Sequence, residues 1–299
     1  MSVKIGIALG GGGARGLSHI GVLKALEEEH IPINYITGTS IGAVVGAIYA
    51  QNPSTDFLME RFKKILADEF NGQLGLNYLK TNSARNGSFL HHAAQKIKKR
   101  IVINLAQSRK ALLKEVRLKN VLCKLIDEGM IEEAKIPLAI VATSLHTGVD
   151  VVFKKGDIIT AVVASCSVPG FLSPVSLNDD LLTDGGVSCP VPVEFLREMG
   201  ADISIGVEIG MREYHPLESV NIIDIIARSD MITSQNLARM MVNTADVAIC
   251  PDTKDIQWSD FSRVDGLIES GKKFTRQKLP EIKRAIKMRC PWYKRVFLT

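Results

Sequence analysis

Residues 33–50 read INYITGTSIGAVVGAIYA, which is a Gly-x-Ser-x-Gly pattern between a strand-like run, Ile33 to Ile36, and an apolar helix-like run from residue 43. A serine on a sharp strand-to-helix turn presents its hydroxyl outward, and flanking glycines remove the side chains that would crowd the turn. The helix that follows points its N-terminal N–H groups and positive dipole end at the site, which suits an anion formed during acyl transfer. The stretch therefore predicts a nucleophilic Ser40, and a simple helix cap is the alternative interpretation.

Strand-like and helix-like runs alternate along the rest of the chain. Strands are expected at 3–9, 137–144, 149–153, 181–183, 203–209 and 245–250, and helices at 17–30, 43–51, 157–165, 193–199 and 220–243. This alternation predicts a largely parallel sheet covered by helices on both faces. Residues 53–130 are polar and helical around a loop-like centre, and they predict an insertion or cap over the core.

A glycine cluster, GGGGARG, follows the first expected strand. Its spacing Gly11-x-Gly13-x-x-Gly16 matches the dinucleotide fingerprint, but that fingerprint needs an acidic residue about 20 residues on, where this chain has the serine turn. The alternative is an oxyanion hole, because successive glycines let backbone N–H groups converge on one point. Both loops would lie at the carboxyl ends of neighbouring strands, where such folds bind ligands. Arg15 would hold this loop, attract a phosphate or be a surface cation.

Ser40 needs a base, and the histidines are weak candidates. Downstream of Ser40 they are His91, His92, His146 and His215, and of these only His215 follows Asp184 as a Ser-acid-His order requires. By contrast, Asp184 ends a short expected strand and is followed by two glycines. A carboxylate within hydrogen-bond reach can act as the base directly when its site is dry enough to raise its basicity. The alternative for Asp-Gly-Gly is an ordinary turn.

Four motifs in this order carry a family resemblance. They are GGGARG at 11–16, GTSIG at 38–42, ASCSVPGF at 164–171 and DGG at 184–186. Together they resemble the patatin-like phospholipase family, over roughly residues 3 to 210. One small departure is Gly10, which stands where some relatives carry an acid. The stretch from 53 to 130 and the tail beyond about 255 match no motif.

The resemblance implies a fold, an activity and a set of site residues. The implied fold is a three-layer α/β/α sandwich, and the implied activity is a serine lipid acyl hydrolase that needs no cofactor and no metal. By the resemblance, Ser40 is the nucleophile, Asp184 is the base, and the backbone N–H groups around Gly11, Gly12 and Gly13 form the oxyanion hole. The other motif or substrate-lining positions are Arg15, Gly16, Gly38, Gly42, Pro169, Gly185 and Gly186. The expected substrates are fatty-acyl esters of phospholipids, lysophospholipids or related lipids.

Charge is distributed unevenly in this chain of 299 residues with a net charge of +5. Segments 85–119 and 272–299 each carry ten Lys and Arg against one Glu, a balance of +9. Apolar residues at helical spacing within them favour contact with an anionic lipid surface, and ordinary helices with solvated faces are the alternative. No recognition motif indicates nucleic acid, and nothing in the sequence indicates an oligomeric state.

The chain begins without a signal-peptide pattern and contains no apolar run of about 18 residues, so we expect a cytoplasmic protein with peripheral membrane contact. We expect a catalytic domain at 1–260, which includes the insertion, and a basic helical tail at 261–299. Two other classes of function stay open: a nucleotide- or phosphate-binding module that uses the glycine loop, and an interaction protein with a vestigial active site.

Overall fold

The computed structural model describes residues 3–70, 115–211, 214, 216–217, 221–253, 256 and 260–289. Its centre is an eight-stranded sheet in the order β5-β6-β3-β2-β1-β7-β8, with β4 paired to β3 beside this path. The strands are β1 (Ile5–Leu9), β2 (Tyr35–Thr39), β3 (Leu138–Ser144), β4 (Asp150–Phe153), β5 (Val175–Leu177), β6 (Asp180–Asp184), β7 (Ile203–Val207) and β8 (Val247–Ile249).

The centre of the sheet is parallel. Strands β1, β2, β3, β7 and β8 pair in parallel, whereas β4, β5 and β6 pair in antiparallel fashion on the β3 side. The expectation of a largely parallel sheet is confirmed, and every expected strand is present. Strand β5 was not expected. It joins β6 through Asn178 and Asp179, whose φ angles are 49° and 61°.

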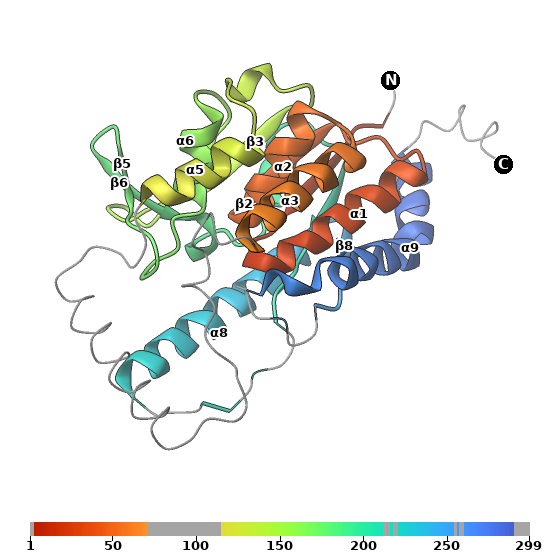
Figure 1. Ribbon diagram of the computed structural model, residues 1–299. Coiled ribbons are helices and arrows are strands. Elements are labelled where there is room, and N and C mark those ends of the chain that lie inside the picture. Colours follow the sequence, from red (N-terminus) through yellow and green to blue (C-terminus); the bar gives the residue numbers. More distant parts are fainter. Residues whose placement is uncertain are drawn as a thin grey trace.

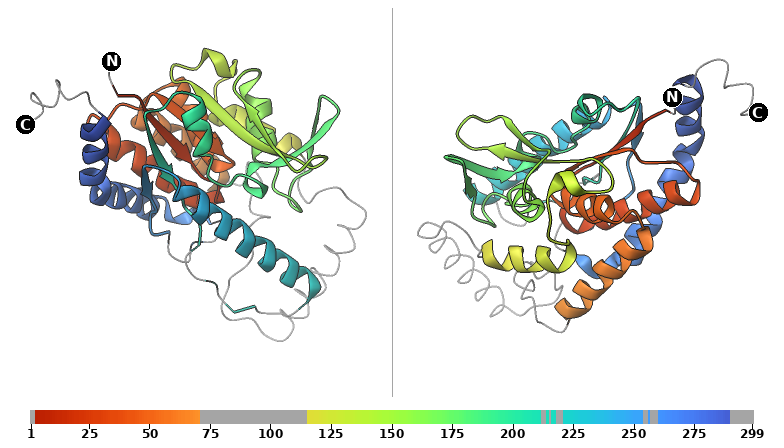
Figure 2. Two further views of the ribbon diagram at one scale, coloured as in Figure 1. Left: turned by 180° about the vertical axis from the view of Figure 1, so that it is seen from behind. Right: turned by 90° about the horizontal axis from the view of Figure 1, so that it is seen from above.

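Helices cover both faces of the sheet, so the fold is the expected three-layer α/β/α sandwich (Figure 1). One face carries α1, α2, α6 and α9, with α3 and α5 packed outside them, and the other carries α7 and the end of α8. The view from behind in Figure 2 brings α8 to the front. The helices are α1 (Leu17–Glu28), α2 (Ile41–Gln51), α3 (Thr55–Phe70), α5 (Glu115–Leu125), α6 (Ile158–Ser165), α7 (Glu194–Glu198), α8 (Ile222–Val242) and α9 (Val264–Arg289).

Strand β1 shows how the sequence builds these layers. Ile5, Ile7 and Leu9 are buried on the face that α1 and α2 cover, while Ala8 packs on the opposite face against Leu196 of α7. Because both faces are covered, the strand is apolar along its whole length rather than alternating between apolar and polar residues.

Strands β2 and β6 share one edge of β3, and this arrangement forms the site. Strand β2 pairs with residues 138–141 of β3 and runs parallel to it, whereas β6 pairs with residues 142–144 and runs antiparallel. Strand β4 overlaps both stretches, so it occupies the opposite edge of β3. The carboxyl ends of β2 and β6 therefore meet. Ser40 directly follows β2, and Asp184 is the last residue of β6.

The described ends of the expected insertion are helical. Helices α3 and α5 bury Leu58, Phe62, Leu122 and Leu125 against the core. Residues 71–114 lie outside the described part of the chain, so the cap and the basic segment at 85–119 stay predictions. Within the described ranges, each helix is too short or too polar to cross a membrane.

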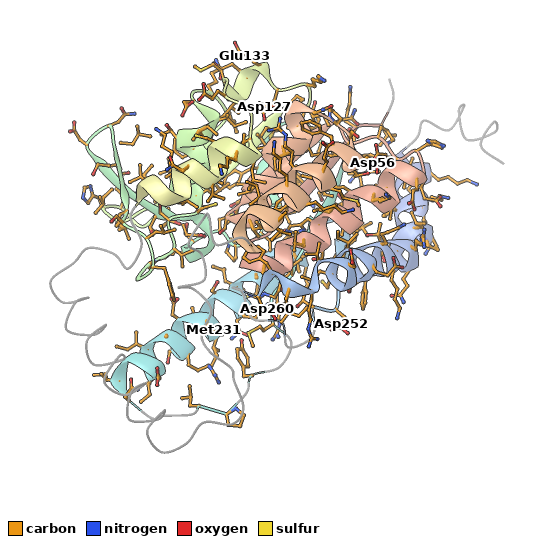
Figure 3. The ribbon with its side chains drawn as sticks, in the orientation of Figure 1. Asp56, Asp127, Glu133, Met231, Asp252 and Asp260 are labelled. Atoms are coloured by element: carbon orange, nitrogen blue, oxygen red, sulfur yellow. The ribbon has the colours of Figure 1, made fainter. Side chains whose placement is uncertain are left out.

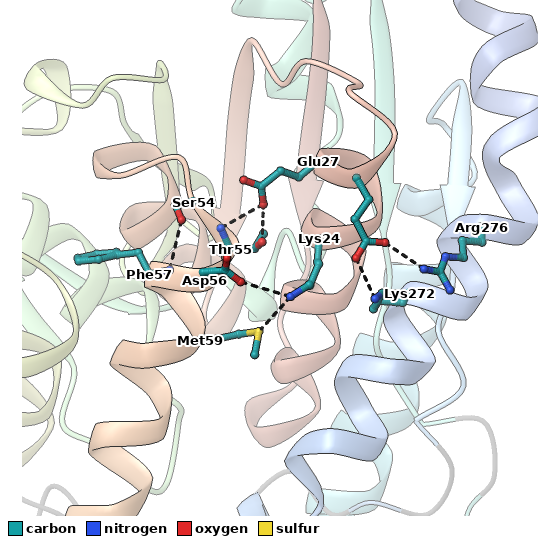
Figure 4. A network of polar contacts seen from close by, with 10 residues as sticks. Lys24, Glu27, Ser54, Thr55, Asp56, Phe57, Met59, Lys272 and Arg276 are labelled. Atoms are coloured by element: carbon teal, nitrogen blue, oxygen red, sulfur yellow. Dashed lines mark hydrogen bonds and ion pairs between the residues drawn. The ribbon is translucent and has the colours of Figure 1, made fainter.

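Helix α9 is the described part of the expected basic tail, and it packs along α1. At their crossing, a Cβ on Gly21 would lie 1.9 Å from the carbonyl oxygen of Ile268, so the two backbones are in contact. Beside the crossing, Lys272 and Arg276 donate hydrogen bonds to Glu28 at 2.9 and 3.0 Å (Figure 4). The domain boundary at residue 260 stays a prediction.

Helix α8 has two dissimilar halves. Ala238 and Val242, near its end, are buried with α7, whereas its first half projects from the body of the molecule (Figure 1). Met231, labelled in Figure 3, lies beyond the sandwich and is 37% exposed. Only the last turns of α8 therefore contribute to the core.

Candidate active site

Ser40 lies on a strained turn between β2 and α2. Its φ of 54° and ψ of −124° are unusual for a residue with a side chain. Its side chain makes no capping hydrogen bond to α2, so the interpretation of Ser40 as a simple helix cap is wrong. Instead, its Oγ donates to Oδ2 of Asp184 at 2.6 Å. The strained turn thus directs the hydroxyl of Ser40 at the carboxylate of Asp184.

The glycines around Ser40 allow the backbones to come close together. A Cβ on Gly42 would lie 2.0 Å from the carbonyl oxygen of Leu9, and one on Gly38 would lie 2.6 Å from the carbonyl oxygen of Gly42. A Cβ on Gly185 would likewise lie 2.2 Å from the carbonyl oxygen of Val141. Gly38 and Gly42 thus set how near β2 and β1 can approach the start of α2, and Gly185 sets how near the turn after β6 can approach β3.

Asp184 is buried, with only 6% of its surface exposed. Besides the bond from Ser40, its Oδ1 accepts the N–H of Gly186 at 2.7 Å, and its carbonyl oxygen accepts the hydroxyl of Thr143 at 3.0 Å. The carboxylate is thus oriented by one bond at each oxygen. The interpretation of Asp-Gly-Gly as an ordinary turn is incomplete, because the turn places this carboxylate at the nucleophile.

Burial raises the pKa of Asp184 from 3.8 to about 6, against the opposing effect of the hydrogen bonds from Ser40 and Gly186. A carboxylate with that pKa is ionised at neutral pH and is a stronger base than an exposed one. The thiol of Cys166 lies beside the pair: burial and the charge of Asp184 raise its pKa well above the usual value, and Ser40 opposes this rise. Cys166 therefore stays protonated next to the carboxylate.

The glycine loop lies next to Ser40. A Cβ on Gly11 would be 3.4 Å from the Cβ of Ser40. The N–H of Gly11 donates to the carbonyl oxygen of Pro190 at 3.0 Å, whereas the N–H groups of Gly12 and Gly13 have no acceptor among the described residues. Gly13 has a φ of 61°, in the left-handed region that favours glycine. Among the described residues, the loop thus combines one glycine in contact with Ser40 and two neighbouring N–H groups without an acceptor.

Arg15 turns back onto the glycine loop. Its Nε donates to the carbonyl oxygen of Gly12 at 3.0 Å, and its buried Nη1 has no hydrogen-bond partner within the described part of the chain. Burial lowers the pKa of Arg15 to about 10, and Glu208 opposes this shift. Of the three alternatives for Arg15, the contact with Gly12 favours a residue that holds the loop. Gly16 follows, and a Cβ there would lie 2.2 Å from the side chain of Ile41.

The motif at 164–171 contributes contacts that the sequence did not indicate. The N–H of Ser40 donates to Oγ of Ser165 at 2.8 Å. The N–H of Asp184 donates to the carbonyl oxygen of Ser167 at 3.0 Å. Pro169 lies in an exposed turn after α6. The motif ASCSVPGF at 164–171 is visible in the sequence, but the sequence does not indicate which of its atoms contact Ser40 and Asp184.

Two of the described histidines, His19 and His146, engage groups other than Ser40. His19 is fully buried and its Nε2 hydrogen-bonds to the carbonyl oxygen of Gly10 at 2.8 Å, while His146 lies 3.4 Å from Asp180. His91, His92 and His215 lie outside the described residues. In the described part of the chain, the Ser40 hydroxyl is therefore paired with a carboxylate.

One group of side chains has the composition of a metal site. Ligand atoms of Asp150, Cys189 and Glu194 lie within 4.8 Å of one another. They take no part in the contacts around Ser40 and Asp184, and nothing else at this position indicates an ion.

Three comparisons with known proteins bear on this site. The family model described as "Patatin-like phospholipase" matches residues 7–197. An uncharacterised NTE family protein of Mycobacterium tuberculosis is 28% identical over 82% of this chain and 57% of its own length. Human patatin-like phospholipase domain-containing protein 6 is 30% identical over 85% of this chain and 16% of its own length. The chain thus spans little more than half of the mycobacterial relative and a small part of the human one.

Among solved structures, VipD from Legionella pneumophila matches with a TM-score of 0.47 and 16% identity, over 93% of this chain and 67% of that chain. The ExoU–SpcU complex of Pseudomonas aeruginosa matches with a TM-score of 0.44 and 16% identity, over 96% of this chain and 52% of that chain.

Proposed function

The chain belongs to the patatin-like phospholipase family, and from this premise we propose that it is a serine lipid acyl hydrolase with a Ser40–Asp184 dyad. The observation that supports the dyad most directly is the 2.6 Å hydrogen bond from Ser40 Oγ to the buried carboxylate of Asp184. The proposed substrates are fatty-acyl esters of phospholipids, lysophospholipids or related lipids. A fungal relative that is 28% identical over 69% of this chain and 12% of its own length bears the name lysophospholipase, which favours this class.

The proposed reaction has two steps. Asp184 takes the proton from Ser40 as Oγ attacks the ester carbonyl, and it passes this proton to the oxygen of the alcohol or lysolipid as that group leaves the tetrahedral intermediate. Water then attacks the acyl-serine with Asp184 again as the base, and this second proton goes to Ser40 Oγ as the bond to the acyl carbon breaks and the fatty acid is released. The raised pKa of Asp184, about 6, suits this role because the group is ionised at neutral pH yet basic enough to accept a proton.

The oxyanion that forms in each step requires donors close to Ser40. We assign this role to the N–H groups of Gly12 and Gly13, which have no acceptor in the described part of the chain. Gly11 has its N–H engaged with Pro190, and its contribution is the close approach of the loop to Ser40. Losing one such donor costs on the order of 3 kcal/mol in the transition state.

The test is a panel of lipid esters combined with a serine-directed fluorophosphonate probe. We expect Ser40→Ala and Asp184→Asn to lose hydrolysis while keeping a cooperative thermal transition. Asp180→Asn is the matched control, because it changes a carboxylate at the other end of the same strand. Full activity of Asp184→Asn would refute the dyad, and a wild-type protein that neither hydrolyses esters nor reacts with the probe would favour a vestigial site.

Contact with anionic lipid through the basic segments stays a prediction. Within α9, Lys272 and Arg276 pair with Glu28 and Lys283 pairs with Glu29 at the end of α1, which reduces the free positive charge there. Binding to vesicles should rise with the fraction of anionic lipid and fall steeply with salt. Binding that does not respond to salt would contradict this prediction.

A further inference from the structure

The strained turn at Ser40 is held through its own backbone N–H. That N–H donates to Oγ of Ser165 at 2.8 Å, a contact between residues 125 positions apart in the chain. A positive φ at a residue with a side chain costs on the order of 1–3 kcal/mol and persists only where the surroundings hold it. The serine hydroxyl at the end of α6 is one such support.

The hydroxyl of Ser165 is itself fixed in direction. Ser165 is fully buried, and its Oγ donates to the carbonyl oxygen of Val141 at 2.6 Å. Because the single hydroxyl proton is directed at Val141, a lone pair of the oxygen is left for the N–H of Ser40. Ser165 therefore connects the middle of β3 to the nucleophile turn.

The same short stretch also holds the other half of the pair. The carbonyl oxygen of Ser167 accepts the N–H of Asp184 at 3.0 Å and the hydroxyl of Thr183 at 2.8 Å. The turn that ends α6 thus contacts the backbone of Ser40 on one side and of Asp184 on the other. Its geometry sets how far apart the two side chains lie.

We propose that Ser165 is a positioning residue that holds the Ser40 hydroxyl in hydrogen-bond reach of Asp184 and of the acyl carbonyl. This inference rests on the proposed function. It also implies that the N–H of Ser40, engaged by Ser165, is no oxyanion donor.

The test compares two buried serines of this turn. Ser165→Ala removes the acceptor of the Ser40 N–H. Ser167→Ala is the matched control, because its hydroxyl is equally buried but donates only to the carbonyl oxygen of Val163 at 2.8 Å, and its contact with Asp184 is made by the backbone. The measurements are the thermal midpoint, kcat and KM for an ester substrate, and the rate of fluorophosphonate labelling.

We expect Ser165→Ala to lower kcat and the labelling rate by roughly 10²-fold with little change in KM, since a misplacement of about 1 Å at a reacting group has that effect. Ser167→Ala should slow both rates far less than Ser165→Ala does, whatever it does to the thermal midpoint, because the contact of Ser167 with Asp184 is made by its backbone. The acidic limb of the rate profile is a second readout. The bond from Ser40 lowers the pKa of Asp184, so its loss should move this limb to higher pH. Among the described residues, Cys166 is the other titratable side chain that faces the carboxylate.

If Ser165→Ala does not fold, Ser165→Thr and Ser165→Val replace it, because they add the same bulk and only threonine keeps a hydroxyl. The threonine variant should then hydrolyse the ester and react with the fluorophosphonate probe much faster than the valine variant. Equal rates in Ser165→Ala and Ser167→Ala, or in the threonine and valine variants, overturn the inference while the proposed function stands. The proposed function, and this inference with it, is overturned if the probe does not label the wild-type protein. The same holds if the probe labels the Ser40→Ala variant as fast as the wild type.

Discussion

Replacing Asp184 by asparagine should stabilise the protein at alkaline pH while removing its activity. The carboxylate is buried, and burial raises its pKa from 3.8 to about 6. A raised pKa means that the folded protein binds this proton more tightly than the unfolded chain does. The stability that the protonated form provides is fully present below pH 3.8, and it is lost as the pH rises through 6.

The size of the effect follows from the shift. Since 6 minus 3.8 is about 2 pKa units and each unit corresponds to about 1.4 kcal/mol, the ionised carboxylate costs about 3 kcal/mol at pH 8. At pH 5 the same linkage gives a cost of about half that value. Asparagine carries no charge, so the free energy of unfolding of Asp184→Asn should exceed that of the wild type more at pH 8 than at pH 5. The difference between the two pH values should be about 1.4 kcal/mol.

Urea titrations of both proteins at pH 5, 6, 7 and 8 measure this difference directly. The matched control is Asp56→Asn, whose carboxylate is 87% exposed, so that removing its charge relieves no burial. In the wild type, kcat/KM should rise over the same interval, with an acidic limb near pH 6, because the ionised form that destabilises the fold is the form that accepts the proton. A stability difference that stays constant from pH 5 to pH 8 would refute this reasoning, even if the variant is inactive.

Three further predictions concern the parts of the fold around the site. Gly21→Ala on α1 should destabilise the protein by at least about 1–3 kcal/mol in urea titrations, because its Cβ would lie 1.9 Å from the backbone of Ile268 on α9. Gly266→Ala on α9 has open space around its Cβ and should stabilise the protein by up to about 1 kcal/mol. Burial lowers the pKa of His19 from 6.5 to about 4. The stability that the neutral form provides should therefore be fully present above pH 6.5 and fall by about 3 kcal/mol as the pH drops through 4. Urea titrations of His19→Gln over the same pH range should lack this loss. Glu28→Gln should cost less than about 1 kcal/mol, and salt should remove the cost, because its ion pairs with α9 are partly exposed; a larger effect at high salt would contradict this.

Most of the elements could be predicted from local patterns. Strands such as β1 and β3 are apolar runs between turn residues, and helices such as α2 and α8 are the longer runs that come after β2 and β7. Strand β5 was missed because three residues are too few to show a period. Its signal was the adjacent Asn178-Asp179, since both residue types tolerate the positive φ that a two-residue hairpin turn requires.

The site was predictable in part, because some of its residues also lie in local sequence patterns. Ser40 directly follows a strand and Asp184 ends one, and glycines follow both within two residues, which is visible in the sequence. Ser165 and Cys166 belong to the motif at 164–171, of which only Pro169 was predicted as a motif or substrate-lining position. A buried serine on an apolar helix gives no local sign of its partner, because the N–H that it accepts belongs to a residue 125 positions away.

The sequence by itself determined the residue types and the family: a serine between glycines, a glycine loop, an Asp-Gly-Gly turn and an alternating series of strands and helices. Only the tertiary structure decided which of these groups meet. Strands β2 and β6 approach along one edge of β3 from opposite directions, so two strand ends 144 residues apart bring Ser40 Oγ within 2.6 Å of Asp184. Local patterns reflect the period of one element at a time, whereas strand pairing, burial and the pKa of about 6 depend on all the elements packed around the carboxylate.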